Sequence, residues 1–198
     1  MGRGLAETPQ LLIVGGPNGA GKTTVALQYA SSEAVAYIGA DAIAALIAPD
    51  DPTSARVDAA RQFIRSVDDT IADKGSCVVE STLSGRSFRN RILEARNLGY
   101  EITIVFVFVD SVDVCIARVA ERVRKGGHDV PESDIRRRYV RSIKNFWLRY
   151  RELADNWVVL YNGGSRIQDV SIGSLRELTV RDATLHKAFL KLVESLND

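Results

Sequence analysis

Residues 16 to 23 combine glycine, lysine and threonine at the spacing G-x-x-x-x-G-K-T, in the segment Gly-Pro-Asn-Gly-Ala-Gly-Lys-Thr. Glycine adopts backbone conformations that a Cβ atom would forbid, so successive N–H groups can turn toward one anion. Lys22 adds a charge suited to the β- and γ-phosphates, and the Thr23 hydroxyl is suited to bind Mg²⁺. The pattern predicts a site for ATP or another nucleoside triphosphate, with contacts from Gly16, Pro17, Asn18, Gly19, Ala20, Gly21, Lys22, Thr23 and Thr24.

Three acids follow predicted strands: Asp41, Glu80 and Asp110. In open α/β sheets, ligands bind at the carboxyl ends of the strands. Each acid also has a structural interpretation. Asp41 could cap the helix expected at Ala42–Ile47, and Glu80 could belong to an ordinary strand exit. For Asp110, with Ser111 beside it, capping of the next helix is the favoured interpretation.

Phosphoryl transfer to a hydroxyl needs a carboxylate that orients the acceptor and takes its proton near the γ-phosphate. Asp41 and Glu80 are candidates for contacting an acceptor or, through water, the Mg²⁺. The residues alone do not assign these two roles. A nucleotide-dependent switch or ATPase, which moves no phosphate to a substrate, stays an alternative, although it would need no acceptor pocket.

The segment from Arg118 to Arg151 is strongly basic. It holds eleven Lys or Arg and four Asp or Glu residues, in a chain whose formal net charge is only +1. Its basic residues do not alternate with aromatic ones on one face, which makes a polynucleotide kinase the less favoured alternative. Nucleic acid is therefore not an expected partner.

Two pairs of arginines in this segment have helical i, i+4 spacing. They are Arg118 with Arg122 and Arg137 with Arg141, and the glycine-containing stretch 126–131 separates them. Two arginine-bearing helices joined by a hinge suit a lid, over about residues 118–145, that closes on a triphosphate and excludes water. We expect Arg118 to contact the nucleotide, Arg122 and Arg137 to neutralise the transferring group, and Arg141 to contact the acceptor.

The elements that position these residues can be read from apolar patterns. Five apolar runs are typical of buried parallel strands: Leu11–Val14, Val35–Ile38, Ser76–Val79, Ile102–Val109 and Trp157–Tyr161. Apolar residues at spacings of three and four predict helices at Ser54–Lys74 and from Pro131 to about Ala154, and a helix is expected at Thr23–Ala30. Strands that alternate with helices predict a parallel α/β sheet with right-handed crossovers.

We expect one domain over residues 1–198, with a hairpin and a helix from Asp182 in the tail 165–198. The composition, 45% hydrophobic and 26% charged, is ordinary for a globular protein. The polar start, Met1 to Gln10, lacks an apolar signal segment, and no apolar run approaches the ~20 residues of a membrane helix. Cys77 and Cys115 suggest free thiols in a reducing compartment. We therefore expect a cytoplasmic protein.

Five segments together resemble the zeta toxin family of P-loop kinases, especially its short single-domain members. They read GGPNGAGKTT, ADAI, ESTLSGRS, LGYEITIVFVFV and RVAERVRKGGHDVPESDIRRRY, and the resemblance covers about residues 10 to 162. It implies a P-loop NTPase fold with a five-stranded parallel sheet of the nucleoside-monophosphate-kinase type and a helical, arginine-rich lid. It also implies ATP- and Mg²⁺-dependent phosphorylation of a sugar hydroxyl, with UDP-N-acetylglucosamine the toxins' known substrate.

The resemblance also implies roles for single residues. Asp41 matches the family's catalytic base, and Glu80 and Thr82 match positions that bind the acceptor. Arg118 and Arg122 resemble lid arginines, of which one stacks on adenine and the other reaches phosphate.

This sequence departs from the family's pattern at several points. Gly39 stands where relatives often carry Asn, Ser84 stands where the toxins have a substrate-contacting arginine, and residues 161–164 read Tyr-Asn-Gly-Gly. A small-molecule acceptor is expected, but its identity, a toxin role and an antitoxin partner do not follow from the sequence.

Overall fold

The computed structural model describes residues 8–86 and 88–196. Most of the polar segment Met1 to Gln10, expected to hold no signal peptide, lies outside these residues. The described strands are β1 (Gln10–Gly15), β2 (Ala36–Ile38), β3 (Cys77–Ser81), β4 (Glu101–Phe108), β5 (Asn156–Tyr161), β6 (Gln168–Gly173) and β7 (Leu178–Val180). The described helices are α1 (Lys22–Ser32), α2 (Ala40–Ile47), α3 (Arg56–Ala72), α4 (Phe88–Asn97), α5 (Val112–Arg124), α6 (Glu132–Asn145) and α7 (Ala183–Ser195).

The strands form one sheet in the order β2-β3-β1-β4-β5-β6-β7. Strands β1 to β5 pair in parallel, whereas β6 and β7 are antiparallel. The expected five-stranded parallel sheet is thus confirmed. The expected C-terminal hairpin extends it to seven strands rather than standing apart. Asp182 caps the following helix, since its side chain accepts a hydrogen bond from the Leu185 N–H at 2.9 Å.

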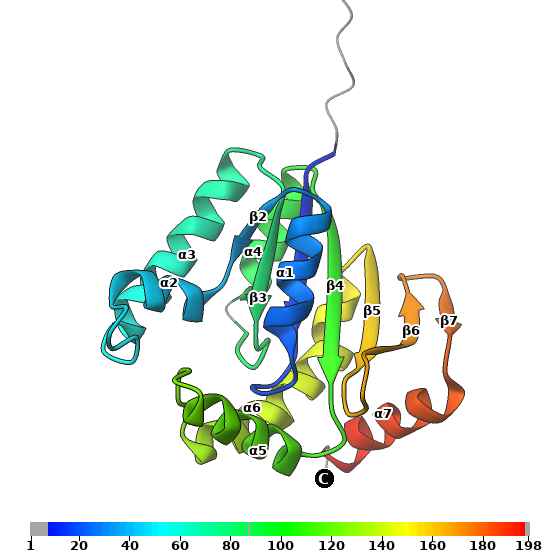
Figure 1. The fold of residues 1–198 in the computed structure, drawn as a ribbon. Coiled ribbons are helices and arrows are strands. Elements are labelled where there is room, and N and C mark those ends of the chain that lie inside the picture. The colour runs from blue at the N-terminus through cyan, green and yellow to red at the C-terminus, as the bar shows by residue number, and fades with distance from the viewer. Residues whose placement is uncertain (1–7, 87, 197–198) are drawn as a thin grey trace, which may run out of the picture.

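The two faces of the sheet are covered unequally (Figure 1). On one face, among the residues that the structure describes, the buried helical side chains come from α1 alone: Val25, Ala26 and Ala30 pack on Val14 and Val105 of the sheet. The other face carries the main core, to which α3, α4, α5, α6 and α7 all contribute. Neighbouring residues of β1 and β4 fall into different clusters, as the alternation of side chains along a strand requires.

The long helix expected from Pro131 to about Ala154 changes its pitch along its length. Regular α6 is followed by a π-helical turn at Phe146–Tyr150 and a 3₁₀ turn at Arg151–Leu153. The Phe146 ring stacks on Phe106 of β4 with centroids 4.3 Å apart. The Tyr150 hydroxyl donates a 2.7 Å hydrogen bond to the Gly85 carbonyl. The π turn therefore begins and ends on side chains fixed against the rest of the fold.

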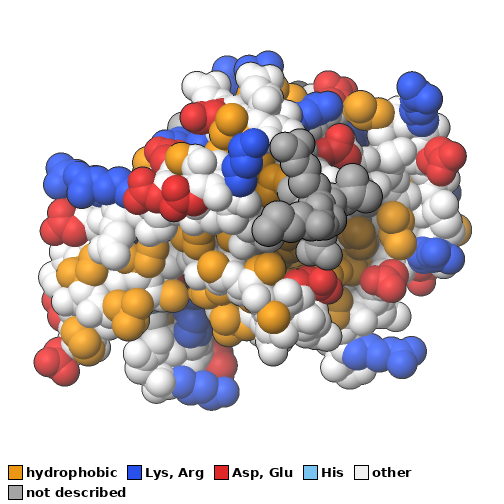
Figure 2. All heavy atoms as spheres, turned by 90° about the horizontal axis from the view of Figure 1, so that it is seen from above, with side chains coloured by type: hydrophobic (Ala, Val, Ile, Leu, Met, Phe, Trp, Pro, Cys, Tyr) orange, Lys and Arg blue, Asp and Glu red, His pale blue; other side chains and the backbone are white. Residues whose placement is uncertain are grey.

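The amino and carboxyl ends of the strands face different surroundings. The amino ends of the strands lie on the face seen in Figure 2, where acidic and basic side chains are interspersed among apolar ones. The carboxyl ends face the arginine-bearing helices α5 and α6 (Figure 1).

None of the described helices combines the length and the apolar character that crossing a membrane requires.

Candidate nucleotide and acceptor site

The loop between β1 and α1 depends on glycine at three positions. The φ angles of Gly16, Gly19 and Gly21 are 142°, 78° and 94°, a region that residues with a Cβ rarely adopt. A Cβ on Gly16 would run into the carbonyl oxygen of Val107, and one on Gly21 into the side-chain amide of Asn162. The loop thus needs positive φ angles at these glycines, and Val107 and Asn162 leave no room for a side chain at Gly16 and Gly21. Its turn leaves the N-terminus of α1 facing the pocket, where the helix dipole favours an anion.

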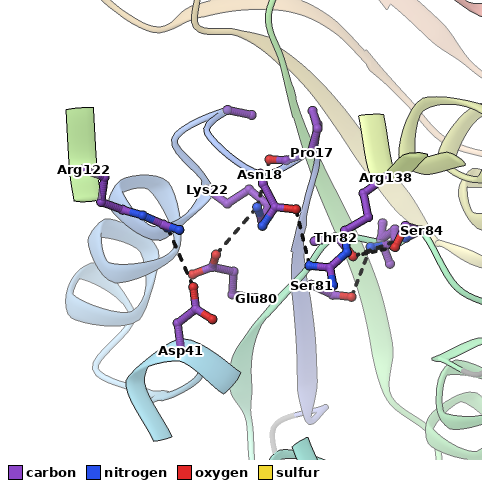
Figure 3. Close-up of polar contacts among 12 residues, drawn as sticks. Pro17, Asn18, Lys22, Asp41, Glu80, Ser81, Thr82, Ser84, Arg122 and Arg138 are labelled. Atoms are coloured by element: carbon purple, nitrogen blue, oxygen red, sulfur yellow. Dashed lines mark hydrogen bonds and ion pairs between the residues drawn. The ribbon is translucent and has the colours of Figure 1, made fainter. Parts of the chain in front are cut away.

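Lys22 is the first residue of α1, and only 6% of it is exposed. Its Nζ donates a 3.0 Å hydrogen bond to the Pro17 carbonyl and lies 3.8 Å from Glu80 Oε1 (Figure 3). Burial lowers the pKa of Lys22, and the negative charges of Glu80 and Asp41 act in the opposite direction. The buried ammonium is therefore held beside a carboxylate at the floor of the loop, where a phosphate would add the opposite charge it needs.

Glu80, near the end of β3, is held by a second partner. The Tyr37 hydroxyl of β2 donates a 2.7 Å hydrogen bond to Glu80 Oε2. Burial raises the pKa of Tyr37, and the adjacent Glu80 raises it further, so the hydroxyl keeps its proton. One oxygen of Glu80 thus faces Lys22 while the other accepts from Tyr37. Sequence reasoning missed Tyr37, because a tyrosine in a short apolar strand carries no distinguishing signal.

Asp41 lies in the first turn of α2, and Gly39 occupies the N-cap position. The alternative interpretation of Asp41 as a helix cap is therefore wrong. Its carboxylate points toward Arg122 of α5, with Oδ2 3.7 Å from Nη1 (Figure 3). The Asp41 side chain is 60% exposed, so this carboxylate is accessible from the pocket.

The lid arginines are anchored by contacts at the pocket. Arg118 Nη1 donates to the Gly19 carbonyl at 3.5 Å, and Arg122 Nη2 donates to the His128 carbonyl at 2.6 Å. Arg138 Nη1 donates to Asn18 Oδ1 at 3.5 Å, which ties α6 to the phosphate-binding loop. Arg137 also lines the pocket.

Arg141 is placed differently from the expectation. It is exposed and lies outside the pocket lining, whereas Arg138 lies within it. The pairing of Arg137 with Arg141 by i, i+4 spacing puts both on one helix face, but the pocket touches only the N-terminal part of α6. The sequence analysis did not assign Arg138 to the site, although the basic run Arg136–Arg138 was a signal that could have identified it.

About half of the basic residues of this segment are paired with nearby acids. Six of its eleven basic residues lie within 4.0 Å of a carboxylate: Arg122, Arg124, Lys125, Arg136, Arg137 and Arg138. Most of these pairs are local, joining residues three or four positions apart in or next to one helix. This arrangement leaves less free positive charge for a nucleic-acid backbone than the sequence count suggested.

The phosphate-binding loop, the two carboxylates and the pocket arginines surround a cavity of about 630 Å³, within the range of small-molecule sites. The carboxylates are Asp41 and Glu80, and the arginines are Arg118, Arg122, Arg137 and Arg138. Thr23, Thr24 and Thr82 line the cavity, and the Thr82 and Ser84 hydroxyls lie 2.9 Å apart. Ser84, which replaces the arginine expected from the toxin pattern, thus contributes a hydroxyl to the wall. Within residues 8–86 and 88–196, no three His, Cys, Asp or Glu side chains cluster as a metal site would require.

Asn162 supports the site from behind, whereas Asp110 lies outside the pocket lining. The cap of α5 is Ser111, whose Oγ accepts from the Val114 N–H at 3.4 Å. The expectation that Asp110 caps this helix is therefore wrong, because Asp110 accepts the Tyr161 hydroxyl at 2.8 Å instead. Asn162, which follows β5, donates to the Ala20 carbonyl at 2.8 Å and so braces the phosphate-binding loop.

The comparisons with known proteins agree with this architecture. Residues 11–140 match the model of a family described as an AAA domain. A protein of Haemophilus influenzae (strain ATCC 51907 / DSM 11121 / KW20 / Rd), described as uncharacterized, is 34% identical over 125 residues, which are 63% of this chain and 88% of that protein.

Two solved structures show the likeness of fold. One is the AvrRxo1-ORF1:-ORF2 structure with ATP, with a TM-score of 0.73 and 16% identity over 94% of this chain. The present chain covers 64% of the matched AvrRxo1 chain, so the two differ considerably in length. The other comes from the PezAT chromosomal toxin-antitoxin system of Streptococcus pneumoniae, with a TM-score of 0.64 and 15% identity over 100% of this chain and 91% of that one. At these identities the likeness concerns the fold.

Proposed function

Because the chain belongs to this AAA domain family and has the fold of P-loop kinases, we propose that it is an ATP-dependent kinase that phosphorylates a hydroxyl of a small molecule. The observation that carries the proposal is the convergence of Asp41 and Glu80 with Lys22 in one pocket. A nucleotide-dependent switch needs no acceptor-side carboxylates, whereas phosphoryl transfer to a hydroxyl does.

In this proposal the phosphate-binding loop holds the β- and γ-phosphates through its N–H groups and Lys22. The residues fit Mg²⁺ as well, because Thr23 offers a hydroxyl on the pocket wall and Glu80 a carboxylate beside Lys22. Mg²⁺, when bound, would neutralise charge on the phosphates. It usually keeps several waters and uses substrate oxygens, so a cluster of protein ligands is not required.

Asp41 is the proposed group that orients the acceptor hydroxyl and takes its proton. It is accessible from the pocket, and its present partner, Arg122, is itself a partly exposed lid residue. Arg122 and Arg137 would stabilise charge on the transferring phosphoryl group, and Arg118 would contact the nucleotide beside Gly19. Donors fixed before the reaction stabilise developing charge without having to reorganise.

Glu80, Thr82 and Ser84 form the wall on which the acceptor would bind. Hydroxyl and carboxylate groups there suit a polyhydroxylated acceptor such as a sugar. A UDP-sugar, as the resemblance to zeta toxins implies, is one acceptor to test.

The test is transfer of labelled γ-phosphate from ATP with Mg²⁺ to a panel of UDP-sugars, free sugars and nucleosides. Lys22→Ala is the inactive reference, and Lys191→Ala, an exposed change on α7, is the matched control that should keep full activity. A labelled acceptor formed by the wild-type chain and Lys191→Ala, but not by Lys22→Ala, supports the proposal. Release of inorganic phosphate alone, undiminished across the whole panel, would favour an ATPase instead.

A further inference from the structure

A second, smaller cavity adjoins the nucleotide pocket. Its volume is about 160 Å³, and it shares Asn18, Asp41 and Arg138 with the larger cavity. Arg56, at the start of α3, and His128, in the loop between α5 and α6, complete its polar wall. The two cavities therefore meet at Asp41, the proposed base.

The charged groups around this smaller cavity are not balanced. Among the described residues, no carboxylate lies within the 4.0 Å ion-pair distance of Arg56. Arg138 shares its carboxylate partner, Asp134, with a neighbouring arginine. Asp41 is already paired with Arg122. The cavity thus has more guanidinium than carboxylate, and it favours an anion.

His128 adds a second, independent indication. Its ring atom Nδ1 is buried and has no hydrogen-bond partner among the described residues. A buried polar atom without a partner is destabilising, so native structures rarely keep one unless water, an ion or a ligand satisfies it. His128 lines the same cavity as Arg56, so an oxygen bound there could become the partner that Nδ1 lacks.

The remaining wall is apolar and closely packed. Ala44 of α2 and Ala59 of α3 are 4% and 1% exposed, and Val130 is 4% exposed. A volume of 160 Å³ corresponds to about five waters at ~30 Å³ each. The cavity is therefore large enough for an anionic group with a few carbons, while the rest of a molecule would extend past Asp41 into the larger cavity.

We propose that the smaller cavity is the subsite that selects the acceptor, and that the acceptor is a hydroxyl-bearing small molecule with an anionic group, either carboxylate or phosphate. Arg56 and Arg138 bind the anionic group, His128 contacts one of its oxygens, and the reacting hydroxyl lies toward Asp41. The identification of the ligand as an acceptor rests on the proposed kinase function, whereas the anion site itself can be tested without turnover.

The first test uses the fact that the chain has two histidines. The ring resonances of His128 and His186 are followed by NMR in the full chain while inorganic phosphate or acetate is added. A non-hydrolysable ATP analogue with Mg²⁺ fills the nucleotide site, and chloride keeps the ionic strength constant. We expect a saturable shift of His128 and none of His186, which lies on α7 beside Trp147.

Two arginines of α3 provide the variant and its control. Arg56→Gln should weaken the anion's affinity about tenfold or more, because a hydrogen bond to a charged group contributes ~1.5–3 kcal/mol. Arg61→Gln, in which a 69% exposed arginine paired with Asp58 is changed, should leave the titration as in the wild-type chain. No shift of His128, or the same titration in Arg56→Gln, would overturn the proposal.

The second test distinguishes the chemical sources of the anion by kinetics with glucose, gluconate and glucose 6-phosphate. One of the two anionic compounds should have a kcat/KM about tenfold or more above that of neutral glucose, and Arg56→Gln should remove this preference mainly through KM. Equal use of all three, or equal losses on all three in Arg56→Gln, would contradict the inference and leave the kinase standing. Arg56-dependent anion binding without phosphorylation of any acceptor would support the anion site and contradict the proposed function.

Discussion

Asp41 of α2 and Arg122 of α5 face each other across the mouth of the pocket, with Oδ2 and Nη1 3.7 Å apart. The pair connects the acceptor side of the molecule to the proposed lid. Their side chains are 60% and 37% exposed, and ion pairs this accessible contribute only about 0–1 kcal/mol. The carboxylate can therefore exchange Arg122 for an acceptor hydroxyl at little cost.

Replacing Asp41 with Asn should lower kcat by about 10²–10⁴-fold, because the amide cannot take the proton of the acceptor hydroxyl. ATP binding should stay nearly intact, since the phosphate-binding loop is unchanged. The measurement is steady-state kinetics together with calorimetric titration of ATP. Asp58→Asn, an exposed change on α3, is the control. Full turnover in Asp41→Asn would remove Asp41 as the base.

Replacing Tyr37 with Phe should reduce kcat/KM for the acceptor about tenfold. The variant loses the 2.7 Å hydrogen bond to Glu80, and a hydrogen bond to a charged group contributes ~1.5–3 kcal/mol. Tyr29→Phe, at a half-buried tyrosine outside the pocket lining, provides the comparison. If both variants behaved alike, Tyr37 would not act through Glu80.

Replacing Gly21 with Ala should destabilise the phosphate-binding loop and weaken ATP binding. The residue has φ of 94°, and such strain costs about 1–3 kcal/mol in addition to the collision with Asn162. In the double variant with Asn162→Ala, the collision is removed and the strain stays, while the hydrogen bond of Asn162 to the Ala20 carbonyl is lost as in the single Asn162→Ala variant. Urea unfolding of both single variants and the double variant should show a coupling of about 0.5–3 kcal/mol. Strictly additive losses would mean that Asn162 does not limit the space at this position.

The stability of the protein should fall in mild acid because of His186. Burial lowers the pKa of His186 below its usual 6.5, so the unfolded chain takes up the proton first as the pH falls. The free energy of unfolding should therefore decrease below about pH 6.5, by at most ~1.36 kcal/mol per pH unit for one proton. Urea unfolding from about pH 5 to 7.5 should give a shallower slope for His186→Gln. Parallel curves would show that another group causes the loss.

The strands could be predicted well because a parallel sheet covered on both faces needs continuous apolar runs, and the five predicted runs overlap β1 to β5 with ends that agree to within two residues. The π turn at Phe146–Tyr150 could not be predicted in this way. Its apolar residues keep the same spacing of three and four in an α-helix. What distinguishes it are contacts with β4 and with Gly85, which are remote in sequence.

The site was predictable where a local motif defines it and less so where distant segments meet. Spacing alone identified the loop at residues 16–23. In contrast, the contact of Arg138 with Asn18 and that of Tyr37 with Glu80 join residues 120 and 43 positions apart. Neither pairing follows from local sequence, because the order of strands and the angle of α6 decide which side chains meet.

Unequal covering of the sheet has a consequence for how the molecule opens locally. One face is protected from water by α1, whose first residue is Lys22 and whose N-terminus faces the candidate nucleotide pocket. Detachment of this single helix would expose that layer and break the phosphate site in the same event. The free energy that bound nucleotide contributes therefore adds directly to the protection of these amides against hydrogen exchange, while amides under the many-helix face gain less. Bound ATP would therefore stabilise one layer of the fold against local opening.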